Sequence, residues 1–315
     1  MQVKSDRVEN PMRTKLLPLL LFASALLFAA CTKPTPVPQP PTPEPPQSTL
    51  AAITQPVTEE AVMNGSYSVR DGQQTVQLAG GKYEAGQGAD YMQVTLLPDI
   101  AYGDLNMDGV PDAAAILAEN YGGSGTFLSL VPVLAKAGGA HPEKGASLGD
   151  RVQVKSLVAE DGVVKVTLLV QAPNDPQCCP SQPQTRIYAY RPGGFGLVLV
   201  SVSSQTADGK QRMITIDLPT PGSEVTSPMT LKGSVTIAPF ENNLAVNLYD
   251  ASGTQVSAGP LAVSAAEMGG PGTFETQIDL AAASVPAGEV RVEVVDQSPA
   301  DGSIHALAAV YVVYK

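Results

Sequence analysis

The sequence predicts a mainly β protein, in which a β-rich domain and then a β-sandwich follow a signal peptide and a proline-rich tether. Charged residues make up only 16% of the 315 residues, whereas long amphipathic helices need a charged face. Glycine (29) and proline (28) are abundant, and runs rich in Val and Thr recur, as expected for short strands joined by turns. The length allows about two domains once a targeting segment is removed.

Residues 1–30 have the layout of a secretory signal peptide. Arg13 and Lys15 precede an uncharged, apolar stretch over 16–30, which ends in small residues. This stretch is shorter than the roughly 20 apolar residues that a membrane-spanning helix requires. Met12 stands directly before the basic pair and is an alternative start of translation to Met1.

The leader ends in a motif that carries a single thiol. Leu27-Phe28-Ala29-Ala30-Cys31 resembles a bacterial lipobox, although that family prefers Leu where Phe28 stands. The resemblance implies cleavage before Cys31 and a diacylglyceryl group on its sulfur. Two acyl chains such as palmitate, at about 0.8 kcal/mol per buried CH₂, would anchor the chain stably. The alternatives are an ordinary signal peptide with an incidental cysteine and an uncleaved N-terminal anchor.

Residues 31–59 form the expected spacer. Eight of the fifteen residues over 32–46 are proline, which excludes both helix and sheet. An extended polyproline-II tether of about 3.1 Å per residue would reach roughly 50 Å, which suits a domain that is lifted off a membrane. A docking site for a proline-recognising module is the alternative.

The first folded region, over 60–205, is expected to consist of strands. The runs 152–159 and 163–170 flank Asp161-Gly162, which predicts a hairpin. A second hairpin is predicted from 186–191 and 196–203, around Pro192-Gly193-Gly194. The segment 113–120 has a helical composition, but its position between a loop and a glycine-rich turn favours a strand.

A polar loop in this region has the spacing of a calcium site. Oxygen-bearing side chains occupy positions 1, 3, 5 and 9, with a glycine at position 6, so that alternate residues can face one cation. The predicted ligands are Asp104, Asn106, Asp108, the Val110 carbonyl and Asp112. The loop resembles those of EF-hand and dockerin proteins, and more closely those of integrin-type propeller repeats. Ala115 replaces the bidentate Glu of an EF-hand, which excludes a full EF-hand. The alternative is a polar turn between strands.

Cys178 and Cys179 are the remaining cysteines, and Pro176 and Pro180 flank them. Thiols outside the cytoplasm tend to oxidise, and a vicinal disulfide fits a tight turn. Two buried thiols and a redox or metal-binding pair are the alternatives.

The second folded region, over 212–315, has strand-sized runs at the spacing of a sandwich. Turn signals such as Ser252-Gly253 and Asp301-Gly302 separate the runs 213–218, 229–236, 244–249, 255–263, 273–280, 289–295 and 306–314. Seven short strands in about 100 residues predict an immunoglobulin-like sandwich.

Several motifs of this region resemble the immunoglobulin-like domain of bacterial spore germination proteins. They are Pro219-x-Pro221-Gly222-Ser223, Leu231-x-Gly233-x-Val235, Pro239-Phe240-Glu241-Asn242-Asn243-Leu244, Leu248-x-Asp250-x-x-Gly253 and Gln297-Ser298-Pro299-Ala300-Asp301-Gly302-Ser303. The resemblance implies an envelope module without catalytic residues. Phe240 and Glu241 are candidate contact residues, and the ordinary interpretation places Phe240 in the core and Glu241 at a turn.

Charge and motifs restrict the function. The net charge is −11, and it is −13 without residues 1–30, so nucleic acid is not an expected partner. His141 and His305 lie in contexts typical of loops, and no phosphate loop or HExxH motif occurs in the sequence. We therefore expect a non-enzyme, lipid-anchored to the cell membrane or outer membrane and facing out of the cytoplasm.

Three functions agree with these observations. The first is a non-catalytic binding or scaffolding module of the cell envelope, which contacts another protein or a cell-wall polymer. The second is a hydrolase that uses carboxylates of the first domain. The third is a structural spacer, stabilised by calcium.

Overall fold

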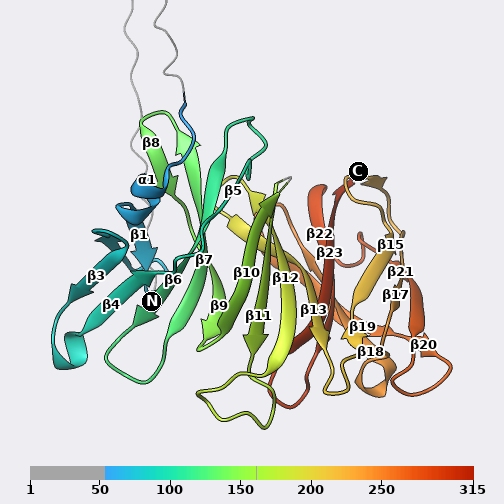
Figure 1. Ribbon diagram of the computed structural model, residues 1–315. Coiled ribbons are helices and arrows are strands. Elements are labelled where there is room, and N and C mark those ends of the chain that lie inside the picture. The colour runs from blue at the N-terminus through green and yellow to red at the C-terminus, as the bar shows by residue number, and fades with distance from the viewer. Residues whose placement is uncertain (1–53, 161) are drawn as a thin grey trace, which may run out of the picture. The chain divides into compact units, whose positions relative to one another are not determined.

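The computed structural model describes residues 54–160 and 162–315, and nearly all of its regular elements are strands (Figure 1). The helical elements of this part are α1 (Glu59–Met63) and two 3-10 helices, η1 (Gly88–Asp90) and η2 (Phe240–Asn242). The predicted fold class is confirmed. No helix within the described ranges is both long and apolar enough to cross a membrane.

The strands fall into two groups along the chain. The first group is β1 (Ser66–Val69), β2 (Gln74–Gln77), β3 (Lys82–Ala85), β4 (Met92–Leu96), β5 (Ala101–Gly103), β6 (Asp112–Asn120), β7 (Phe127–Lys136), β8 (Gly139–Pro142), β9 (Ala146–Asp150), β10 (Gln153–Glu160), β11 (Val163–Val170), β12 (Gln182–Arg191) and β13 (Gly196–Gln205). The second is β14 (Gln211–Arg212), β15 (Ile214–Leu218), β16 (Glu224–Val225), β17 (Met229–Val235), β18 (Asn243–Tyr249), β19 (Gln255–Ala262), β20 (Ser264–Ala265), β21 (Gly272–Ile278), β22 (Gly288–Gln297) and β23 (Ile304–Tyr314).

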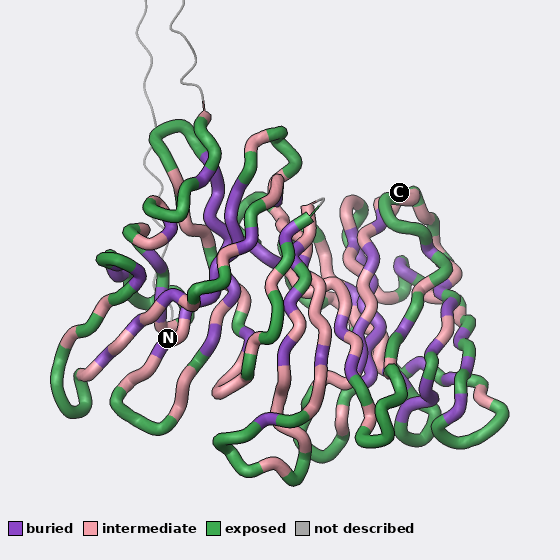
Figure 2. The backbone as a smooth tube through the Cα atoms, in the orientation of Figure 1, coloured by how far each residue is buried: buried purple, intermediate pink, exposed green. Residues whose placement is uncertain are grey.

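The first region is built around strand β6, which is buried on both faces (Figure 2). It lies inside a seven-stranded sheet of order β3-β4-β6-β7-β8, to which β5 and β9 add. Ala113, Ala115 and Leu117 pack on one side, in a cluster with residues of α1, β1 and β2. Ala114 and Ile116 pack on the other side, against β11, β12 and β13. A continuous apolar run is what a strand covered on both faces requires.

The local predictions for this region are confirmed. Residues 113–120 lie in β6 and form a strand. Strands β10 and β11 pair antiparallel, as do β12 and β13, so both predicted hairpins form.

The second region is a two-layer sandwich. A four-stranded sheet, β15-β17-β21-β20, packs against β18, β19, β22 and β23 over one apolar core. Strand β17, which covers most of the predicted run 229–236, alternates, with Leu231 and Val235 buried and Lys232 exposed. Gly233 is required between the strands, because a Cβ there would lie 2.0 Å from the Thr215 carbonyl oxygen and 2.4 Å from the Phe274 ring. The seven predicted strands are all present.

One ten-stranded sheet runs through both regions. Its order is β10-β11-β12-β13-β23-β22-β18-β19, with β14 and β16 beside this path, so that β10 and β19 are its outer strands. β13 and β23 join the regions by the antiparallel pairs Ser201↔Ala308 and Val202↔Leu307 (Figure 1). The described residues 54–160 and 162–315 accordingly belong to one compact unit. The predicted boundary near 205–212 falls between β13 and β15, and the division into two domains stays a prediction.

Polar groups reinforce this junction around a small apolar cluster of Val202, Val295 and Leu307. The Gln184 side chain donates to the Ile304 carbonyl at 2.9 Å, and the Ser204 hydroxyl donates to the His305 carbonyl at 2.7 Å. Both side chains are buried, so their hydrogen bonds replace those lost to water. The junction therefore holds the two regions in one fixed orientation.

Candidate functional site

Several predicted features lie outside the described residues. These are the signal peptide over 1–30, the lipidation residue Cys31 and the spacer up to residue 53. Cleavage, lipidation and the extended tether stay predictions.

The predicted calcium loop links β5 to β6, and Asp112 is its buried member. The Asp112 side chain accepts hydrogen bonds from the backbone amides of Leu105 (3.1 Å), Asn106 (3.3 Å) and Ala135 (2.7 Å). Burial raises the pKa of this carboxyl above its ordinary value, although the three amide donors act in the opposite direction. Asp112 thus ties the loop to β7.

The other loop carboxylates also face donors of the loop itself. Asp104 accepts from the amides of Asp108 (3.0 Å) and Gly109 (2.7 Å). Asp108 accepts from the Val110 amide (2.9 Å) and from the Asn106 side-chain amide (2.9 Å). These bonds supply the favourable partners that three neighbouring carboxylates need.

The oxygen atoms of this loop are already engaged in hydrogen bonds with the loop and with β7. Each carboxylate oxygen of the three aspartates already accepts a hydrogen bond, and the Asn106 side chain donates one. Within residues 54–160 and 162–315 no group of three or more His, Cys, Asp or Glu side chains is arranged to hold a metal ion. The arrangement therefore does not form a ready calcium cage, and the predicted site stays a prediction.

Cys178 and Cys179 lie in the turn between β11 and β12. The structure joins them as a vicinal disulfide, with their Cα atoms 3.8 Å apart. Nearby, the Asp175 carboxylate accepts from the Ala172 amide and from the amide and hydroxyl of Ser181, which closes the turn. The structural role of the disulfide stays a prediction.

The expectation that Phe240 fills the core is wrong. Its side chain is 68% exposed. It lies in η2, where Glu241 and Asn242 adopt positive φ angles of 54° and 53°. Phe240 borders a surface groove of about 520 Å³, together with Leu244, Pro260 and other residues of β18, β19 and β22. A left-handed turn after Pro239 directs the ring outward, which the apolar residue type alone did not indicate.

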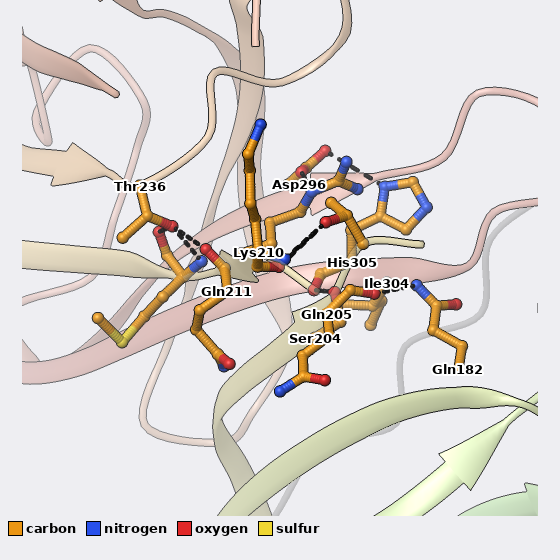
Figure 3. A network of polar contacts seen from close by, with 12 residues as sticks. Gln182, Ser204, Gln205, Lys210, Gln211, Thr236, Asp296, Ile304 and His305 are labelled. Atoms are coloured by element: carbon orange, nitrogen blue, oxygen red, sulfur yellow. Dashed lines mark hydrogen bonds and ion pairs between the residues drawn. The ribbon is translucent and has the colours of Figure 1, made fainter. Parts of the chain in front are cut away.

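The expectation that both histidines lie in loops is also wrong. His141 is in β8, and His305 is in β23. The His305 Nδ1 is 3.8 Å from a carboxylate oxygen of buried Asp296 (Figure 3). The Nε of Arg212 lies 3.7 Å from the other oxygen. Nearby, the Thr236 hydroxyl donates to the Gln211 carbonyl at 2.7 Å (Figure 3). These contacts fasten the segment that links the two regions.

The junction also forms a cavity of about 540 Å³, which sequence reasoning did not find. Three lining residues form a row across neighbouring strands of the sheet. Tyr249 of β18 pairs with Arg291 of β22, and Arg291 pairs with Tyr311 of β23. We call this lining the junction cavity, and it consists of Lys144, Arg191, Pro192, Phe195, Leu197, Val198, Leu199, Tyr249, Asp250, Ala251, Gly253, Glu289, Arg291 and Tyr311.

Two arginines cover the two tyrosine rings of the junction cavity. The Arg191 guanidinium carbon lies 4.1 Å from the Tyr311 ring centre, and that of Arg291 lies 5.0 Å from the Tyr249 ring centre. Arg191 also pairs with Glu289, so β12 is tied to β22 across the junction. Burial raises the pKa of both tyrosines.

The acidic groups of the junction cavity are all engaged. Asp250 accepts hydrogen bonds from Ser252 and Thr254 within its own turn, and the Ser252 hydroxyl bond is the main cause of its lowered pKa. Glu289 is held by Arg191. The arrangement is suited to binding rather than to acid–base chemistry. No sequence signal identifies it, because its residues come from strands and turns that are far apart in the sequence.

Comparisons with known proteins identify the second region. Residues 213–303 match the family described as the immunoglobulin-like domain of bacterial spore germination. The predicted resemblance and the sandwich are thereby confirmed for this part of the chain. A search of curated proteins found no match.

A search of solved structures found the tetra-tandem repeat in the extending region of a large adhesion protein. The match has 15% identity and a TM-score of 0.22, and it covers 71% of this chain and 70% of that one. A likeness of this size supports no conclusion about fold or function.

Proposed function

We propose that the chain is a lipid-anchored, non-catalytic binding or scaffolding module of the bacterial cell envelope. The observation that carries this proposal is the ten-stranded sheet that runs through both regions. A sheet shared in this way presents two surfaces at a fixed angle, which suits a platform for another envelope protein or a cell-wall polymer. The immunoglobulin-like domain over 213–303 fits a binding or structural module.

The anchor is inferred from the sequence. Cys31 stands at the end of an apolar leader, and the proline-rich tether follows it. A stiff body on a long tether can search the space above a membrane while it stays attached.

The hydrolase alternative has less support. Retaining and inverting glycosidases place two free carboxyl groups about 5–9.5 Å apart in a cleft. In the first region, Asp71 and Glu119 line a cavity of about 480 Å³, and Glu119 already accepts hydrogen bonds from the Arg70 amide and the Tyr121 hydroxyl.

Metabolic labelling with an alkyne analogue of palmitate tests the anchor. We expect the full chain expressed in bacteria to take up the label and to sediment with membranes. The variant Cys31→Ala should lose the label, whereas a Cys178→Ala/Cys179→Ala double variant should keep it. An unlabelled wild-type chain would contradict the anchor.

Photo-crosslinking on intact cells tests the binding role. A photoreactive residue in place of Phe240 should capture a defined envelope component, and one in place of exposed Lys165 should not. Absence of any captured component from both positions would favour the structural spacer.

Calcium binding to the loop over 104–112 is a separate proposal. A site with a dissociation constant of about 10⁻⁴–10⁻³ M would stabilise the fold by about 1–2 kcal/mol at 5 mM calcium. Thermal unfolding in calcium, magnesium and EDTA would detect this, with Asp108→Asn as the variant that abolishes it. An unfolding temperature that is the same in calcium and EDTA would reject the site.

A further inference from the structure

We propose that the junction cavity binds an organic carboxylate, with the anionic group on Lys144 and Arg191 and the apolar part against Phe195 and Leu197. The site differs from the anchor and from the surface around Phe240. All of its residues lie in the described body of the protein, so the proposal does not depend on the anchor.

One basic group of the junction cavity has no counter-charge of its own. Three basic and two acidic residues line the cavity. Arg291 pairs with Glu293 and Arg191 pairs with Glu289, whereas Asp250 accepts hydrogen bonds within its own turn. Lys144 is exposed and has no carboxylate within ion-pair distance among the described residues.

Arg191 has donors to spare. In the described part of the chain its side-chain hydrogen bond is made by one nitrogen, Nη2, to Glu289. A guanidinium group carries five N–H donors in a rigid fork, which suits a carboxylate. The Arg191–Tyr311 stacking holds that fork in place, so little conformational freedom is lost on binding.

The aromatic residues argue against a neutral sugar. Sugars need an open ring face to stack on, and the tyrosine faces of the junction cavity are covered by Arg191 and Arg291. The remaining ring is Phe195, which is 36% exposed. An apolar group packed on Phe195 and on Leu197 would bury surface that water now contacts, at about 25 cal/mol per Å².

Phe195 is held in its position by the neighbouring turn. Gly253 has a φ of 77°, and a Cβ at that residue would lie 2.8 Å from the Phe195 ring. The β12–β13 turn therefore packs closely on the β18–β19 turn, and the junction cavity is preformed. Its volume of about 540 Å³ lies in the range of small-molecule sites, roughly 300–1,000 Å³.

The carboxylate can come from two sources, a free small acid or the C-terminal end of a short peptide. Phenylacetate serves as the probe for the first, and acetyl-Ala-Phe with a free carboxylate serves for the second. Phenylacetamide and the C-terminal amide of the dipeptide are neutral probes of nearly equal size.

Saturation-transfer NMR on the purified full chain in deuterated detergent measures the binding of each probe. We expect phenylacetate, the dipeptide acid or both to bind, and the two amides to bind at least threefold more weakly. Binding of the dipeptide acid alone would assign the peptide source. Lys144→Gln should weaken binding of the acid about three- to tenfold. Lys165→Gln, an exposed lysine on β11, should leave it unchanged.

Two outcomes would overturn the proposal. One is equal binding of acids and amides, and the other is the absence of binding by every probe. Thermal unfolding of each variant verifies that it is folded. Phe195→Ala provides a second measure, because it should weaken the binding of phenylacetate although Lys144 is still present.

Discussion

In the first region the central strand β6 is covered by apolar side chains on both faces, whereas in the second region β17 alternates between the core and solvent. Strand β22 lies between these cases. Val290, Val292 and Val294 fill the sandwich core, and Arg291 and Glu293 on the opposite face are also largely buried, at the junction. The two strands show that a strand can be buried on its second face in two ways. In β6 that face is apolar and packs on another layer of the same region, whereas in β22 it is charged and lies at the junction between the two regions.

The largest effect is expected in the core of the second region. Leu231 is fully buried, so Leu231→Ala should lower the free energy of unfolding by about 2–5 kcal/mol. Urea denaturation measures this. Leu218→Ala, at a position 43% exposed, is the matched control and should cost much less. Equal costs would contradict the single buried face of this sheet.

A small-to-large substitution tests strand β6, which is covered on both faces. Ala115 is fully buried in β6, and Ala115→Leu should cost about 1–3 kcal/mol because neither layer can move away. Ala258→Leu in outer strand β19, where the residue is exposed, should be nearly neutral. A neutral Ala115→Leu would show that the two layers are less closely packed than described.

The buried carboxylate at the start of β6 adds a dependence on pH. Asp112→Asn replaces an acceptor oxygen by a donor that faces backbone amides, which should cost about 1–3 kcal/mol. Burial raises the pKa of Asp112 in the folded state, so its contribution to stability is greatest below its ordinary value of 3.8. That contribution falls as pH rises to the raised value.

Urea denaturation at several pH values from 3 upward tests this sign. The wild-type protein should lose stability in that window relative to Asp112→Asn. Asp99→Asn, at an exposed residue, should follow the wild type. A relative change in the opposite direction would contradict the raised pKa.

The smallest effect is expected at the polar junction. Ser204→Ala removes the hydrogen bond to the His305 carbonyl and should cost about 0.5–1.5 kcal/mol. Ser201→Ala lies in the same strand, and within the described residues its hydroxyl has no hydrogen bond. Thermal unfolding of both variants measures the difference. Equal values would show that the Ser204 bond contributes nothing to holding the regions together.

Local patterns were sufficient to predict the strands. The strand-sized runs and turn signals of the second region, the two hairpins of the first region and the spore germination motifs all led to the fold found. Each of these signals lies within a few residues of its partner or within one domain.

The candidate site was less accessible to sequence reasoning. The β13–β23 pairing joins residues about 100 positions apart, and such a contact leaves no local periodicity. The junction cavity depends on this pairing, so the sequence around Arg191 and Tyr311 did not indicate that these residues share a site. Phe240 was misjudged because an apolar residue after a proline fits a core position and an outward turn equally well.

Joining the two regions through one sheet lengthens that sheet and leaves β19 as an outer strand, with unpaired backbone groups along one side. An exposed edge strand can pair with strands of neighbouring molecules and so start aggregation. Pro260 lies within β19, and a proline in an edge strand has no backbone N–H to donate to a strand of another molecule. Many copies crowded together could therefore touch without polymerising.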